Sequence, residues 1–169
     1  ERYFDQNEGI SLPNFPVIET WSLHVPENIL KATLSESELT LLLLALCPHF
    51  NSNLLDEVIQ NILASTGDFP QLGGVRGKNF RGFLPTGQTA LFLLAGNDLK
   101  KRKEIQEIFN TDHFFEKNHI LWLEDVPEGE PKMSGKIIIS QEYAHLFIFG
   151  KESKPKFSMK FPAQVIETE

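Results

Sequence analysis

The feature that most constrains the fold is a capped and almost wholly apolar helix in the first third of the chain. Residues 35–38, Ser-Glu-Ser-Glu, form a capping box, because the Ser35 hydroxyl can accept the amide proton of Glu38 and the Glu38 carboxylate can reach back to Ser35. The leucine-rich run 39–47 follows directly and is apolar on nearly every side of a helix. We therefore expect a central buried helix that ends at Pro48.

The residues after Pro48 predict three more helices. One begins at Asn53 and ends at Gly67, since its apolar residues recur at intervals of three and four. Its polar residues are expected to face solvent: Asp56, Glu57, Gln60 and Asn61. A nearly apolar helix follows at residues 86–95, closed by Gly96. Asp98 then caps a helix over residues 99–109, whose apolar residues are expected to pack inward: Leu99, Ile105, Ile108 and Phe109.

Beyond Phe114 the pattern changes to short strands. The runs 120–123 and 136–139 predict two strands joined by a long acidic loop, and Ser140 begins a short helix. The expected fold class is therefore α+β, a helical core with a C-terminal β-hairpin. Winged-helix domains have the same element order, several helices followed by a β-hairpin. We therefore expect the fold to be winged-helix-like.

One domain with short flanking segments is the expected organisation. A chain of 169 residues that is 41% hydrophobic can bury one well-packed core. Residues 1–25 are expected to form an irregular arm that packs back through Phe15, Ile18 and Trp21, and the domain itself spans residues 26–163. The first residue is Glu1 rather than methionine, so we expect this chain to be part of a longer protein.

The charge and cysteine content indicate a compartment and disfavour some partners. With 23 acidic and 16 basic side chains, the formal net charge is -7, so the average surface repels a phosphate backbone and disfavours nucleic acid. The single cysteine, Cys47, lies in the leucine run, where burial would raise its pKa and leave it inert. No apolar run approaches the ~20 residues of a membrane span, and no signal segment opens the chain. We expect a cytoplasmic protein without membrane contact.

A near match to a phosphate-binding loop lies at residues 82–89. The spacing fits G-x-x-x-x-G-K-[ST], but Gln88 stands where the lysine belongs, and a neutral amide cannot neutralise the terminal phosphates. A second near match, residues 73–79, has its Gly-Lys pair one residue too early and Asn79 in place of the magnesium ligand. We expect a degenerate P-loop-like sequence whose glycines serve turns, with no cofactor bound to this chain.

Catalytic and metal-binding patterns are not found in the sequence. It contains neither a G-x-S-x-G elbow nor an H-E-x-x-H pair. Asp112, His113 and His119 could converge only through folding, and we expect Asp112 to cap the following turn instead. Glu128 and Glu130 lie in an exposed turn, which lacks the burial that separates the pKa values of catalytic carboxylates. We therefore expect no catalytic residue, no metal site and no enzyme activity in this chain.

The glycine-rich connection at residues 68–85 favours an interaction surface. It combines backbone freedom with cations and aromatic rings, the side chains that anchor many interfaces. The residues expected to form such an interface are Arg76, Lys78, Phe80, Arg81, Phe83 and Gln88. The sequence fits equally well an arrangement in which the aromatic residues tuck beneath the loop: Phe69, Phe80 and Phe83.

A basic run offers an alternative function, nucleic-acid binding. The helix at residues 99–109 carries four cations in its first turns, at the end where cations oppose the helix dipole. They are Lys100, Lys101, Arg102 and Lys103. Winged-helix domains contact duplex DNA through such a helix and through the hairpin. The acidic hairpin loop would repel phosphate, so the sequence favours a solvated face over this alternative.

Several segments together carry a resemblance to a known family. They are GFLPTGQTALFLLAG (82–96), DHFF (112–115), ILWLE (120–124), PEGEP (127–131), SG (134–135) and FSMKFPA (157–163). These segments resemble the region N-terminal to the ATPase core in a family of bacterial AAA-type ATPases, some associated with phage-tail-like contractile injection systems. The resemblance covers about residues 41–163 and is most distinctive at 82–96.

The resemblance implies an accessory role. Residues 26–163 would be a winged-helix-like accessory domain, and residues 164–169 would begin the linker to a downstream ATPase module. ATP and magnesium would bind that module, since the matched segments contain no catalytic residue. The implied function is non-catalytic: the domain would mediate contacts with a protein partner, a substrate or neighbouring subunits of a parent ATPase that can oligomerise.

Overall fold

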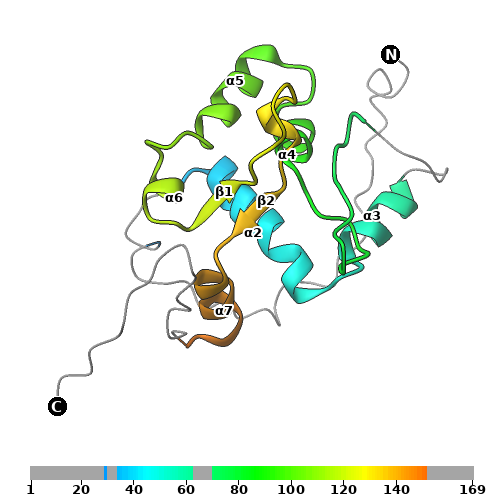
Figure 1. The fold of residues 1–169 in the computed structure, drawn as a ribbon, viewed down its shortest axis with the longest axis vertical. Coiled ribbons are helices and arrows are strands. Elements are labelled where there is room, and N and C mark those ends of the chain that lie inside the picture. Colours follow the sequence, from blue (N-terminus) through cyan, green and yellow to red (C-terminus); the bar gives the residue numbers. More distant parts are fainter. Residues whose placement is uncertain (1–28, 30–33, 63–69, 152–169) are drawn as a thin grey trace.

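The computed structural model describes residues 29, 34–62 and 70–151 and has a mixed helical and β architecture (Figure 1). In chain order its elements are α2 (Glu36–Phe50), α3 (Leu54–Ile62), α4 (Gly87–Ala95), α5 (Leu99–Glu107), α6 (Phe114–Lys117), β1 (Leu121–Leu123), the 3-10 helix η2 (Lys132–Ser134), β2 (Ile137–Ile139) and α7 (Gln141–Phe149). The α+β class expected from the sequence is therefore confirmed. The arm at residues 1–25, Gly67, Phe69 and residues 164–169 lie outside the described residues.

Helix α2 begins as the capping box predicts but ends later than expected. The Ser35 hydroxyl accepts the amide proton of Glu38 (3.3 Å), and the Glu38 carboxylate accepts that of Ser35 (2.7 Å). The prediction that Pro48 ends the helix is wrong, because α2 continues to Phe50. Pro48 removes one backbone donor, yet the amide of Asn51 still closes the last turn on the carbonyl of Cys47 (3.1 Å).

The core forms around α2, which lies at the centre of the molecule and contacts α3, α4, α7 and β2 (Figure 1). Its buried residues are Leu41, Leu42, Leu44, Ala45 and Leu46. The central buried helix is confirmed, but the apolar run is not buried throughout, because Leu39 and Leu43 are 49% and 40% exposed. These two residues are four apart and share one stripe of the helix, and no described element covers that stripe fully.

Helices α4 and α5 form a tight hairpin. Thr86 caps α4 through the amide of Thr89, and Gly96 ends it at φ 52. The Asp98 carboxylate then caps α5 by accepting the amide protons of Lys100 (2.9 Å) and Lys101 (3.1 Å), as predicted.

The inward and outward faces of α5 differ partly from expectation. Ile105 and Phe109 are buried as expected. Leu99 is 81% exposed, so its predicted inward packing is wrong. Leu99 is the first residue of α5 and follows the turn that leads away from the core. Because α5 is the outermost helix at one end of the molecule, no other described helix covers this residue (Figure 1).

The two predicted strands pair as an antiparallel hairpin. Leu121, Trp122 and Leu123 are opposite Ile139, Ile138 and Ile137 in register. Burial alternates along both strands, so that Trp122 and Ile138 share the more exposed face. The opposite face carries the buried leucines and isoleucines that join the core, and β2 packs on α2.

The turn before α6 is capped by a different residue from the one predicted. We expected Asp112 to cap it, but His113 is the N-cap, and its Nδ1 accepts the amide proton of Phe115 (3.2 Å). The Asp112 carboxylate is almost wholly exposed and lies 4.0 Å from the Lys117 ammonium. Ser140 begins α7 as predicted, through the amide of Tyr143 (3.2 Å).

Candidate interaction site

The P-loop-like segment is occupied by contacts within the protein. The amide of Gly87 donates to the carbonyl of Gly135 (3.0 Å), and the amide of Thr89 donates to the Thr86 hydroxyl (3.4 Å). A Cβ on Gly87 would lie 2.7 Å from Met133, because η2 packs directly on the start of α4. The first turn of α4 therefore offers these two amides to its own chain, whereas a phosphate-binding loop would keep them for the ligand.

Gln88, which stands at the position of the P-loop lysine, connects two parts of the chain through its side-chain amide. Its amide nitrogen donates to the carbonyl of Gln71 (3.0 Å), and its amide oxygen accepts from the guanidinium of Arg102 (3.0 Å). Arg102 also donates to the carbonyl of Gly96 (2.9 Å). We predicted Gln88 as an interface residue, and the structure places it where it joins the glycine-rich loop to α5.

The glycine-rich segment folds back on itself as a small hairpin loop. Val75 and Leu84 form an antiparallel bridge with two hydrogen bonds of 3.0 and 2.9 Å, and Gly77 donates to the carbonyl of Phe80 (2.9 Å). We call residues 75–84 the clamp loop. At its base Gly74, with φ 92, lies against the ring of Phe83, where a Cβ would be 2.1 Å from the nearest ring carbon.

Asp56 of α3 holds the clamp loop on both of its sides. Its carboxylate pairs with Arg76 at 2.8 Å and accepts the amide proton of Phe83 at 2.7 Å. Arg76 also donates to the carbonyl of Arg81. The sequence-based expectation that Asp56 faces solvent is wrong: its side chain is 17% exposed and points into the loop. Its partners are separated from it by 20 and 27 residues, and no local pattern marks such a contact.

The tip of the clamp loop carries the predicted interface cations. Lys78 and Arg81 are exposed, and neither side chain has a partner among the described residues, whereas Phe80 and Phe83 are half-buried. Arg76 and Arg81 line a cleft of about 490 Å³ against α3, with Asn53, Asp56, Glu57, Gln60 and Gly82. The structure thus brings two of the predicted arginines together and leaves Gln88 apart from them.

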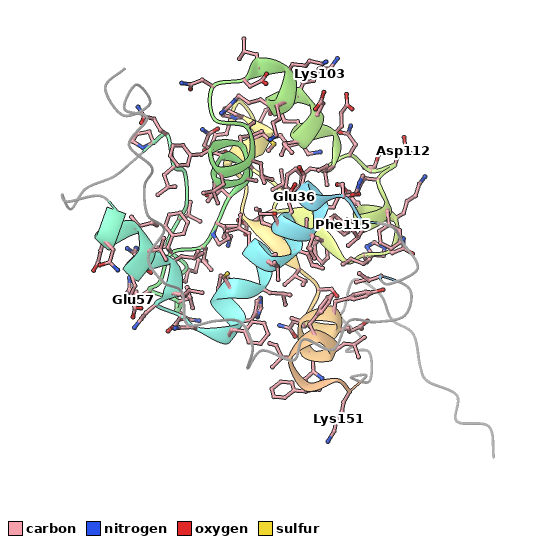
Figure 2. The ribbon with its side chains drawn as sticks, turned by 180° about the vertical axis from the view of Figure 1, so that it is seen from behind. Glu36, Glu57, Lys103, Asp112, Phe115 and Lys151 are labelled. Atoms are coloured by element: carbon pink, nitrogen blue, oxygen red, sulfur yellow. The ribbon has the colours of Figure 1, made fainter. Side chains whose placement is uncertain are left out.

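The basic run on α5 divides into two kinds of side chain. Lys100, Lys101 and Lys103 are exposed, while Arg102 is half-buried and bound to Gln88 and Gly96. Figure 2 shows Lys103 pointing outward from the end of the molecule, on a different side from α3 and Glu57. The lysines and the clamp loop are therefore separate surfaces.

A third polar cluster joins the starts of α2 and α6. The His113 Nε2 lies 2.9 Å from one oxygen of Glu38, and the other oxygen accepts the Ser35 hydroxyl proton at 2.5 Å. Because Nδ1 accepts the Phe115 amide, the proton resides on Nε2, which donates to Glu38. The carboxylate sits between the serine and the histidine, so His113 cannot take the Ser35 proton as the base of a hydrolytic triad does.

Acid should weaken this cluster. Burial alone would raise the pKa of Glu38, but hydrogen bonds from Ser35 and the proximity of His113 outweigh it and hold the pKa below its usual value. The stabilisation is therefore present above the unfolded pKa of about 4.3 and is lost as the pH falls through the folded value. We expect Glu38→Gln to lower the free energy of unfolding by about 1 kcal/mol at pH 7. The difference from the parent should shrink toward zero at pH 3.

Urea unfolding at both pH values measures this difference. The matched control is Glu107→Gln. Glu107 is exposed and lines the same surface cleft as Ser35, Glu38 and His113, and its replacement should change stability by less than about 0.5 kcal/mol at either pH. A Glu38→Gln penalty that persists at pH 3 would contradict the ionised Glu38 in this network.

The remaining candidates of the sequence form no site. Burial raises the pKa of the half-buried Cys47 thiol, as expected. His119 and Asp112 lie exposed, and within residues 29, 34–62 and 70–151 no three metal-ligating side chains gather around one point. Glu128 and Glu130 lie exposed in the loop between the strands.

Comparison with protein-family models, with curated proteins and with solved structures finds no match to this chain. In the described part of the chain, no helix combines the length and apolar content that crossing a bilayer requires.

Proposed function

We propose that this chain is a non-catalytic interaction domain that binds an acidic segment of a protein partner through the clamp loop. The observation that carries the proposal is the pair of contacts from Asp56, which fix the loop at Arg76 and Phe83. Between these fixed points, the side chains of Lys78 and Arg81 have no partner among the described residues. A rigid loop that presents unpaired cations is suited to binding, because less conformational entropy is lost when the partner docks.

The cleft beside the loop supports a peptide as the ligand. The Arg81 guanidinium can bind a carboxylate through two parallel hydrogen bonds. Asn53 and Gln60 line the same cleft, and their amides can both donate to and accept from a peptide backbone. The half-buried ring of Phe80 adds an aromatic contact at the tip, as many interface anchors do.

We further propose that the domain is winged-helix-like and is the N-terminal accessory region of a bacterial AAA-type ATPase. This rests on the resemblance of residues 82–96 and of the later segments, with ATP and magnesium bound by the downstream module. The reading frame after Glu169 tests it: a strand followed by G-x-x-x-x-G-K-[ST] supports the proposal, and a continuation without that motif contradicts it.

The alternative, a nucleic-acid-binding winged helix, finds less support at the hairpin. The two lysines of the loop between the strands are already bound within the chain: Lys132 donates to the carbonyl of Phe109 (2.7 Å), and Lys136 pairs with Glu124 (2.9 Å). The first half of this loop is rich in exposed carboxylates, among them Asp125, Glu128 and Glu130. Such a wing would repel phosphate rather than grip it.

A peptide titration tests the clamp-loop proposal. A fluorescein-labelled peptide rich in Asp and Glu, with one central aromatic residue, is compared with a peptide in which every acid is replaced by its amide. We expect the acidic peptide to bind, the amide peptide to bind at least about tenfold more weakly, and Arg81→Glu to lower the affinity at least about tenfold.

The matched control is Lys117→Glu, which makes the same charge change on α6 at the opposite side of the molecule (Figure 1). It should leave the affinity within about twofold, because its weak partner Asp112 and its own ammonium are both exposed. Equal losses of affinity in Arg81→Glu and Lys117→Glu would show general charge attraction and would contradict the proposal. The absence of binding by the parent chain would contradict it as well.

A further inference from the structure

Helix α5 carries its charges in the order that opposes its own dipole. Lys100 lies in the first turn and Lys103 in the middle of the helix, whereas Glu104 follows Lys103 directly and Glu107 is the last residue. The positive end of the helix dipole is the N-terminus, so cations there and anions at the other end are both unfavourable. The fold of a single chain offers no compensation through these four side chains, because all are exposed and none has a partner in the described residues.

The four charges also share one side of α5. Lys100, Lys103, Glu104 and Glu107 stand at intervals of three and four, so they form a single stripe that is positive in its first half and negative in its second. Lys100 and Glu104, and likewise Lys103 and Glu107, are four residues apart, yet no ion pair joins them in the described structure. The stripe therefore presents both of its signs to whatever lies against it.

We infer that α5 is a self-association surface on which α5 of a second copy of this chain lies antiparallel. In that arrangement the lysines of one helix face the glutamates of the other, and the relation holds in both directions, as a two-fold axis requires. The two helix dipoles are then antiparallel, which is also favourable. A stripe of this order is complementary to itself, and this charge complementarity identifies the second copy as the occupant.

Two further features of the α4–α5 hairpin fit this contact. Leu99, at the start of α5, is 81% exposed, so the surface also offers an apolar contact. Helix α5 is the outermost helix at its end of the molecule, which leaves room for a second chain (Figure 1). A contact built mainly on nine-residue helices is smaller than a standard interface of roughly 1,600 Å², so the dimer is weak and salt-sensitive.

Charge-reversal variants test this inference in a way that separates it from general charge effects. One variant, Lys100→Glu with Lys103→Glu, makes the stripe wholly negative, and the other, Glu104→Lys with Glu107→Lys, makes it wholly positive. Sedimentation velocity in 50 mM NaCl should show concentration-dependent dimers for the parent chain and monomers for each variant. An equimolar mixture of the two variants should again form dimers, because the negative stripe then faces the positive one.

The complete exchange of all four charges provides a further check that does not depend on loss of assembly. That variant keeps a self-complementary stripe and should dimerise like the parent, and its Tm should rise because the charges now agree with the helix dipole. Raising NaCl to 500 mM should lower the association constant of the parent at least about tenfold.

Three results would overturn the inference. The first is a parent chain that remains monomeric at millimolar concentration in low salt. The second is a mixture of the two variants that associates no more than either variant alone. The third is a monomeric parent that binds duplex DNA and loses this binding in the Lys100→Glu, Lys103→Glu variant, since the lysines would then serve nucleic acid.

Discussion

Replacing Gly87 with alanine should lower the free energy of unfolding by about 2–3 kcal/mol, the range expected for forcing atoms into a packed site. The new Cβ would lie 2.7 Å from the terminal carbon of Met133, 2.9 Å from its carbonyl oxygen and 3.0 Å from its Cα. Two of these three contacts are to backbone, so η2 must shift, and with it the hydrogen bond from Gly87 to Gly135. Thermal and urea unfolding would measure the loss, expected as a fall in Tm of about 5–10 °C.

A double-mutant cycle identifies the cause of that loss. In a Met133→Ala background, the flexible part of the obstruction is gone, so Gly87→Ala should cost clearly less than in the parent. Because the contacts with the Met133 backbone remain, part of the cost should persist, and a Gly87→Ala variant without cost in either background would contradict the packing of η2 on the start of α4.

The same variant distinguishes packing from nucleotide binding. If residues 82–89 acted as a phosphate-binding loop, Gly87→Ala would keep the parent's stability and abolish a shift in Tm caused by magnesium-ATP. We expect no such shift in the parent, and none after Gln88→Lys, because the amides of Gly87 and Thr89 are bound within the chain. A magnesium-ATP shift in the parent that disappears in Gly87→Ala would refute this interpretation.

Local sequence signals predicted most of the elements correctly. The caps at Ser35, Asp98 and Ser140 fix where α2, α5 and α7 begin, because each cap acts on amides two or three residues away. The short apolar runs 120–123 and 136–139 likewise mark where β1 and β2 form. These signals depend on neighbours in the chain, so one sequence contains all that is needed to read them.

The errors occur where a distant part of the chain decides the outcome. Leu39, Leu43 and Leu99 are apolar at helical positions, but whether another element covers them depends on how the helices pack. His113 replaces Asp112 as the cap of α6, and its other nitrogen binds Glu38, which is 75 residues earlier. Neither a composition nor a spacing rule predicts a contact of that range.

The candidate site was predicted only in part for the same reason. Glycines and cations marked the clamp loop, and Lys78 and Arg81 are exposed in the structure. What makes the loop rigid is Asp56, which looked like one acid among several on the polar face of α3. Its contacts with Arg76 and Phe83 arise only once α3 packs beside the loop.

Replacing Asp56 with alanine should therefore damage both stability and binding. The Phe83 amide would lose a 2.7 Å hydrogen bond to a charged acceptor, and Arg76 would lose its ion pair, together costing about 2–3 kcal/mol. Most of this comes from the amide, since the Arg76 side chain is 58% exposed and solvent screens its pairing. Because the loop would no longer be fixed before binding, the acidic peptide should bind at least about tenfold more weakly.

Two companion variants separate the contributions of Asp56. Asp56→Asn keeps an oxygen that can accept the Phe83 amide proton and loses only the charge, so it should cost about 1 kcal/mol and change peptide binding little. Glu57→Ala removes the neighbouring carboxylate, which is exposed at the edge of the same cleft, and it should change stability by less than about 0.5 kcal/mol. Hydrogen exchange at the Phe83 amide gives a direct reading: its protection should fall strongly in Asp56→Ala and persist in the other two variants. If exchange at Phe83 is equally fast in the parent, Asp56 does not hold the loop, and rigidity cannot be the basis of its binding.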